Sequence, residues 1–191
     1  MNRLRISLIN LLFAIVLLSL YPISLIAQPG FESLNFKHNW ELKMLEHGFQ
    51  LISKSPAPVP FSMNGEPQAS MVISASKLDL STKINLEDIM KDEVAGINND
   101  LVIDEYLEDD FTPKDNIVSY TNILAGNKIA VIKYRTKGDK RNPAAMSRSI
   151  RHILFIKDNM LYISTVIVLY AEDQDNIRND QIKLVEYILN K

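Results

Sequence analysis

Residues 149–170 read SIRHILFIKDNMLYISTVIVLY, two apolar runs joined by Asp158-Asn159. Asp and Asn tolerate the positive backbone angles of a two-residue turn, so this stretch predicts a hairpin of two antiparallel strands. Leu161–Leu169 is apolar at nearly every position, which is typical of a strand buried on both faces. The hairpin therefore decides the fold, because its second strand requires a central place in a sheet with cover on both sides.

The sequence before this hairpin continues the strand pattern. Ile117–Leu124 and Lys128–Thr136 flank Ala125-Gly126-Asn127, which is a second hairpin-type turn. Alternating or apolar runs predict four further strands, at residues 40–45, 49–53, 71–75 and 102–107. Prolines cannot donate to a strand ladder, so Pro56, Pro58, Pro60 and Pro67 predict an extended loop between the second and third strands.

Two segments change to a helical period. Residues 85–101 carry apolar side chains every three or four positions, with Asn85 as the expected N-cap and 98–100 (Asn-Asn-Asp) as the expected end. The segment from Asp173 to the C-terminus carries a broad apolar stripe, which Arg178 and Gln181 interrupt near its start. Strands, a helix, five more strands and a final helix predict an α+β domain with a mainly antiparallel sheet and two principal helices.

Residues 1–27 have the order of a secretory signal peptide: basic residues, an apolar run, and a small residue at Ala27. The alternative is an uncleaved membrane anchor, since residues 6–26 are long enough to span a bilayer. We expect an exported protein, periplasmic or secreted, with a tether at 28–39 and one domain at 40–191.

Composition excludes several classes of function. The chain has no cysteine, which excludes disulfides, thiol catalysis and cysteine-based metal sites. Without Arg3 and Arg5 it carries 19 basic and 23 acidic side chains, a formal charge of −4. A mildly acidic chain is a poor general binder of nucleic acid, so we expect no nucleic-acid partner.

The element order resembles a known family. Several features in order resemble the PsbP-like family and the DcrB-type exported bacterial proteins. They are the export leader, a first strand with Trp40, a hairpin ending at Gly48-Phe49, one amphipathic helix, residues 125–130 (AGNKIA), and the final hairpin and helix. The resemblance implies an α/β/α sandwich around an antiparallel sheet over most of 40–191. It also implies non-enzymatic work, since members of this family are mostly accessory subunits and binding partners, and a related eukaryotic member binds a small GTPase.

Catalytic and metal-binding patterns are not apparent in the sequence. The histidines, His38, His47 and His152, have no spacing that brings them together on one element, and His152 alternates with apolar residues that predict a packed layer. The chain lacks the hydrolase, metalloprotease and phosphate-loop motifs. We therefore predict no catalytic residue, cofactor or metal. Residues 108–110 (Glu-Asp-Asp) have the oxygen ligands for calcium, but a solvated acidic loop is the alternative.

Basic residues gather in the second half of the chain. Lys133, Arg135 and Lys137 share a strand face by parity. They belong to a predicted partner-binding surface that comprises Lys133, Arg135, Lys137, Lys140, Arg141 and Arg148. Such a surface suits an acidic or phosphate-bearing partner. The alternative is that it neutralises the acidic residues of the same molecule.

These observations leave three functional hypotheses. The first is an exported, non-catalytic accessory or binding protein for a protein partner or a membrane-associated complex, with membrane association only through an uncleaved leader or that partner. The second is a carrier of hydrophobic small ligands, with a pocket lined by Tyr162, Val166 and Val168. The third is an enzyme that uses carboxylates alone, those of Glu105, Glu108 and Asp110.

Overall fold

The computed structural model describes residues 34–45, 48–54, 68–78, 85–104, 117–136, 148–168 and 174–191. The strands are β1 (Trp40–Leu45), β2 (Gly48–Ser53), β3 (Ala69–Lys77), β4 (Val118–Leu124), β5 (Asn127–Thr136), β6 (Arg148–Lys157) and β7 (Met160–Val168). The helices are α2 (Leu86–Asp104) and α3 (Gln174–Leu189). The predicted α+β class with a mainly antiparallel sheet is therefore confirmed.

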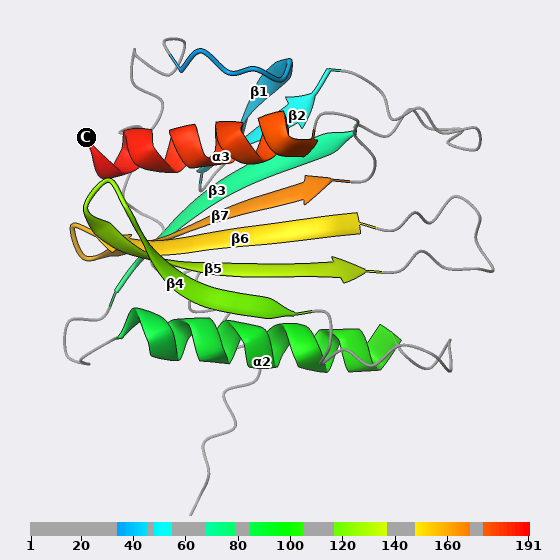
Figure 1. Ribbon diagram of the computed structural model, residues 1–191, viewed down its shortest axis with the longest axis vertical. Coiled ribbons are helices and arrows are strands. Elements are labelled where there is room, and N and C mark those ends of the chain that lie inside the picture. The colour runs from blue at the N-terminus through cyan, green and yellow to red at the C-terminus, as the bar shows by residue number, and fades with distance from the viewer. Residues whose placement is uncertain are drawn as a thin grey trace, which may run out of the picture.

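The strands form one seven-stranded sheet in the order β1-β2-β3-β7-β6-β5-β4, and every neighbouring pair is antiparallel (Figure 1). β7 occupies the middle, as its apolar sequence predicts, while β1 and β4 are the edges. The N-terminal strands join the sheet through the pairing of β3 with β7, in which Ala69 lies opposite Val168.

The helices lie on opposite faces of the sheet. Alternate residues of β5 separate into two core clusters: Val131 packs with residues of α3, and Ile132 packs with residues of α2. We call these sides the α3 face and the α2 face. In Figure 1, α3 crosses the half of the sheet that holds β3 and β7, and α2 runs beside the half that ends in β4. Each helix thus covers only part of its face.

The central strand β7 is less evenly buried than its sequence predicts. Ser164, Val166 and Val168 are buried toward α3, whereas the alternating residues toward α2 are half-buried. The difference follows from the placement of α2, which packs mainly against β5, β6 and β4.

Local sequence explains the turns and a helix start. Ala125 (φ +48°) and Gly126 (φ +76°) connect β4 to β5, and Asp158 (φ +50°) and Asn159 (φ +60°) connect β6 to β7, so both connections are two-residue turns with positive backbone angles. Asn85 caps α2, because its Oδ1 accepts a hydrogen bond from the N–H of Glu87 at 3.2 Å. These three predictions are confirmed.

One predicted strand is wrong. Residues 102–104 belong to α2, which continues through the expected stop at 98–100. Asparagine in a helix interior costs less than about 0.7 kcal/mol relative to alanine, so burial of Ile97 in the α2-face cluster is enough to offset it. The sheet consequently has four strands after α2, and not five.

Several predicted features lie outside the described residues: the leader at 1–27, the proline-containing loop, His47, and residues 105–116 with their carboxylates. Within the described ranges, no helix combines the length and apolarity needed to cross a membrane.

Candidate binding surface

The start of α3 is fixed to the sheet by buried polar groups. Gln181 is fully buried, and its Nε2 donates to the carbonyl oxygen and to Oγ of Ser164 at 2.9 and 3.1 Å. Its Oε1 accepts a hydrogen bond from Nε of Arg151. The polar interruption of the helix stripe is therefore a buried hydrogen-bonded contact with β6 and β7.

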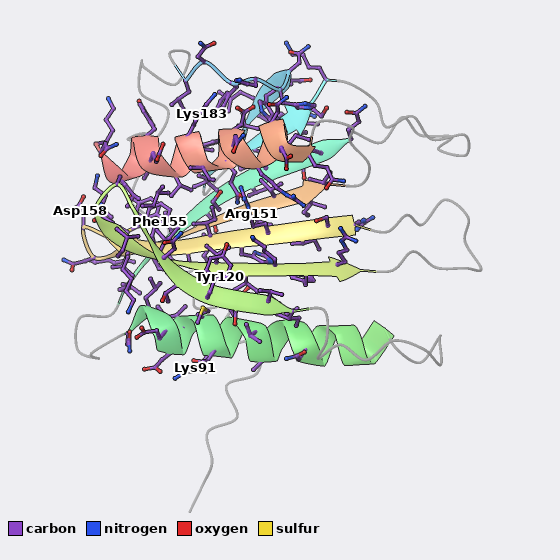
Figure 2. The ribbon with its side chains drawn as sticks, viewed as in Figure 1. Lys91, Tyr120, Arg151, Phe155, Asp158 and Lys183 are labelled. Carbon is purple, nitrogen blue, oxygen red and sulfur yellow. The ribbon has the colours of Figure 1, made fainter. Side chains whose placement is uncertain are left out.

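Arg151 places a positive charge beneath this end of α3. Its Nη2 donates to the carbonyl oxygen of Arg178, and Figure 2 shows the side chain beside the first turns of the helix. Burial, and then the charge of Arg178, lowers the pKa of Arg151 to about 10, so the guanidinium stays charged at neutral pH. Its partners are an amide and a carbonyl, and among the described residues no carboxylate forms an ion pair with it.

The sheet register brings further cations to the same face. Lys133 lies directly opposite Arg151, and Arg135 is two residues further along β5. Both side chains are exposed on the α3 face, as parity predicts for these two residues. Like charges directly opposite each other destabilise a sheet, so the pairing of Lys133 with Arg151 has a cost that an anionic ligand would relieve.

Exposed apolar side chains complete the surface. Val118 of β4 lies opposite Lys133 and is 55% exposed. Nζ of Lys133 is 5.2 Å from the ring centroid of Tyr120, so the cation lies over the aromatic face. We call this region the cationic surface, and it comprises Val118, Tyr120, Lys133, Arg135, Arg151 and Arg178.

The predicted partner-binding set is only partly brought together. Arg148 lies opposite Thr136, one position out of phase with Arg135, so it belongs to the α2 face and its predicted grouping with Lys133 is wrong. Lys137, Lys140 and Arg141 lie outside the described residues. Sequence reasoning missed Arg178; the only signal was its position three residues before Gln181 on an otherwise apolar stripe.

Two acidic residues in the first turn of α2, Glu87 and Asp88, pair with other cations. Glu87 binds Nζ of Lys128, and this hydrogen bond, followed by that from Asn85, lowers the pKa of Glu87. Asp88 pairs with Lys91 at 3.2 Å. In the described part of the chain, neither acid neutralises Lys133 or Arg135.

Two other polar groups are structural. Asp180 is fully buried, and its carboxylate accepts hydrogen bonds from the N–H groups of Lys37 and His38 and from Nε1 of Trp40. His152 faces α2 within a packed layer, as predicted, and its Nδ1 lies 2.9 Å from Oγ1 of Thr165. Among the residues that the structure describes, no three His, Asp or Glu side chains form a group that could hold a metal ion.

The predicted carrier pocket is filled. Val166 and Val168 are buried in the core, and the ring of Tyr162 stacks on Phe155 with centroids 5.0 Å apart. A separate groove of about 580 Å³ lies between the N-terminal segment and α3. It is lined by Leu34, Asn35, Lys37, Lys183, Glu186, Tyr187, Asn190 and Lys191. The lining thus combines the apolar surface of Leu34 and Tyr187 with charged and amide side chains, and it does not include the residues predicted for the carrier pocket.

Comparisons with known proteins give distant likenesses to solved structures. No protein-family model and no curated protein matches the sequence. LpqN of Mycobacterium tuberculosis, which is involved in cell envelope biogenesis, is 9% identical with a TM-score of 0.44, over 81% of this chain and 79% of LpqN. A protein of unknown function from Pseudomonas aeruginosa is 12% identical with a TM-score of 0.38, over 74% and 90%.

A third structure, from Bacteroides thetaiotaomicron, is 9% identical with a TM-score of 0.43. The match covers 80% of this chain and 42% of that protein, so this chain spans less than half of the larger one. All three likenesses are too distant to indicate a function, which is therefore inferred from this chain's own residues.

Proposed function

We propose that this protein is an exported, non-catalytic binding protein that recognises an acidic protein partner through the cationic surface. The observation that carries the proposal is the juxtaposition of exposed Lys133 and Arg135 with the half-buried charge of Arg151, on the part of the α3 face that α3 leaves open. Positive charge beside exposed aromatic and aliphatic side chains is typical of protein recognition.

Three further observations support this function over catalysis or transport. The buried polar clusters around Asp180 and Gln181 use their hydrogen-bonding groups to hold α3 and the N-terminal segment. The predicted carrier lining is packed core. The N-terminal sequence has the order of an export signal, and the resemblance to PsbP-like proteins implies accessory roles, and both support a partner in the cell envelope.

Site-specific crosslinking in intact cells tests the proposal. A photoreactive residue at Val118 should capture one discrete partner, whereas the same residue at Leu42, an exposed apolar position on the opposite edge strand, should not. The double variant Lys133→Glu/Arg135→Glu should lower the yield roughly tenfold, because repulsion replaces attraction at the contact.

The matched control is Lys43→Glu/Lys91→Glu, which makes the same change in net charge at exposed positions away from the cationic surface. It should leave the crosslink intact. Equal yields from Val118 and Leu42, or equal losses in the two double variants, would contradict the proposal. Turnover of a substrate by the purified protein would contradict its non-catalytic part.

A further inference from the structure

The outer edge of β4 lacks the features by which sheets avoid pairing with other chains. Its sequence, VSYTNIL, has no charged residue and no proline, and residues 118–123 are all exposed. Edge strands are normally protected by charge, proline or a bulge. The opposite edge, β1, carries Glu41 and Lys43. Of the two edges of this sheet, β4 is therefore the one suited to accept another strand.

The hairpin geometry shows which backbone groups face outward. In a two-residue hairpin the residues flanking the turn form a hydrogen-bonded pair, here Leu124 with Asn127, and the pattern alternates along the strand. Ser119, Thr121 and Ile123 thus direct their N–H and C=O groups away from β5. The N–H of Ile123 donates to Oδ1 of Asn122 at 2.8 Å, which agrees with an N–H that does not pair with β5. In the ranges that the structure describes, the N–H groups of Ser119 and Thr121 have no recorded partner.

The positive charge of the neighbouring strand β5 determines which kind of chain can pair favourably with the β4 edge. Lys133 and Arg135 are exposed on β5, and Lys133 leans over the ring of Tyr120 in β4. A second copy of this chain, paired β4 to β4, would bring two such sets of cations to one face, which like-charge repulsion disfavours. A segment with carboxylates on the α3 side would be attracted to them.

We propose that an extended acidic segment of the partner pairs with β4 as an additional strand of the sheet. Its backbone pairs with the outward groups of Ser119 and Thr121, and its carboxylates lie on the α3 side beside Lys133. On the α2 side it meets Ile123, which is 62% exposed, so apolar residues alternate with the acidic ones. This inference rests on the proposed function and specifies how the partner binds.

The test uses the purified wild-type protein and two synthetic peptides. One peptide alternates Glu with Val, and the other alternates Lys with Val. At millimolar concentration the acidic peptide should slow amide hydrogen exchange of Ser119 and Thr121 by roughly tenfold or more, because pairing protects these groups from water. The basic peptide should not. This measurement on the unaltered chain does not depend on the folding of any variant.

Two variants separate backbone pairing from charge. Thr121→Pro removes an outward N–H but leaves the β4–β5 ladder intact, and Lys133→Glu/Arg135→Glu reverses the charge. Each should weaken binding of the acidic peptide roughly tenfold. The matched controls are Leu42→Pro and Lys43→Glu/Lys91→Glu, and both should bind the acidic peptide normally. The same alternation of inward and outward backbone groups gives Leu42 an outward N–H on β1.

Absence of protection at Ser119 and Thr121, or normal peptide binding by a folded Thr121→Pro, would overturn strand pairing. Self-association of the wild type that Thr121→Pro abolishes would assign the edge to a second copy and would also overturn the proposal. If Thr121→Pro retains the Val118 crosslink in cells, the proposed function stands and only the strand-pairing mode fails.

Discussion

At the scale of single residues, substitution of two glycines by alanine should change the stability in opposite directions. Gly48 has φ +152°, and a Cβ there would lie 2.1 Å from the carbonyl oxygen of Ile73 in β3. We expect Gly48→Ala to lower the free energy of unfolding by roughly 2–3 kcal/mol, because backbone must move. A Cβ at Gly96 in α2 would have no neighbour within 4 Å, so Gly96→Ala should raise this free energy by about 0.5–1 kcal/mol. Urea unfolding measures both, and changes of the same sign would contradict the prediction.

His152 predicts a pH dependence. Burial lowers its pKa from 6.5 to about 4, so the unfolded chain binds more protons than the folded chain between these values. Stability from this group is therefore present above pH 6.5 and is lost as the pH falls toward 4, by about 3 kcal/mol.

The measurement is urea unfolding of wild type and His152→Gln at neutral pH and near the lower end of this interval. The variant keeps a hydrogen-bonding side chain but has no group that titrates there, so it should lose less stability on acidification. An identical loss in the two proteins would assign the acid sensitivity to other groups.

The alternation of side chains along a strand explains for which residues the face of the sheet could be predicted from the sequence. It correctly put His152 in a packed layer and Lys133 with Arg135 on one face, because strand side chains alternate strictly. Parity could not be applied to Arg148, because the residues between 136 and 148 carry no signal of the register that sets Arg148 opposite Thr136. The partial burial of Arg151 likewise could not be predicted from the sequence, because it depends on contact with α3.

At the scale of elements, Asp180 joins α3 to the segment that precedes β1. Its carboxylate accepts two backbone N–H groups, at 2.9 Å from Lys37 and 2.8 Å from His38, and the indole N–H of Trp40 at 3.1 Å. Nζ of Lys183 donates to the carbonyl oxygen of Asn35 nearby. Residues 34–39, which belong to the predicted tether, are thus held against the helix.

We expect Asp180→Ala to lower the free energy of unfolding by about 3 kcal/mol, because it leaves buried N–H donors without an acceptor. The fluorescence of Trp40, the single tryptophan, should shift to longer wavelength as the N-terminal segment detaches. Asp175→Ala, at an exposed position on the same helix, is the control and should leave the emission unchanged. An unchanged spectrum in Asp180→Ala would contradict the role of this carboxylate.

Elements with local signals were predictable, and those set by distant contacts were not. Both hairpins have turn residues that tolerate positive φ, so their positions follow from the sequence. The end of α2 does not, because the asparagines at 98 and 99 favour a stop only weakly, and contact of Ile97 with the sheet outweighs them.

At the scale of the whole molecule, the two core layers are unequal. The α3 face buries Ile177, Leu184, Val185, Ile188 and Leu189 of its helix. Within the described side chains, α2 contributes only Leu86 and Ile97 as buried residues. Burial of apolar area is the main stabilising contribution, so α2 is the less firmly held layer.

Native-state hydrogen exchange should show this difference. Amides in β6, β7 and α3 should exchange only through global unfolding, whereas those of α2 should exchange through a smaller opening of lower free energy. The denaturant dependence of each amide distinguishes the two routes. Equal opening free energies for α2 and β7 would show that the layers unfold together.

The order of strands is the feature that sequence reasoning left open. The hairpins predict β4 with β5 and β6 with β7, and the apolar sequence of β7 predicts its central place. No local sequence signal predicts that β3 is the other neighbour of β7. The paired residues Ala69 and Val168 are separated in the sequence by most of the domain.

The long-range pairing of β3 with β7 also limits when the N-terminal strands can join the sheet. A ribosome makes the chain from its N-terminus, so β1, β2 and β3 emerge well before the strand at 160–168 to which they attach. Until then these early strands have no docking site, and closing so large a loop is slow. A chain built in this way stays unfolded for longer after synthesis, which would suit the export that we propose, because a narrow translocation channel admits only unfolded polypeptide.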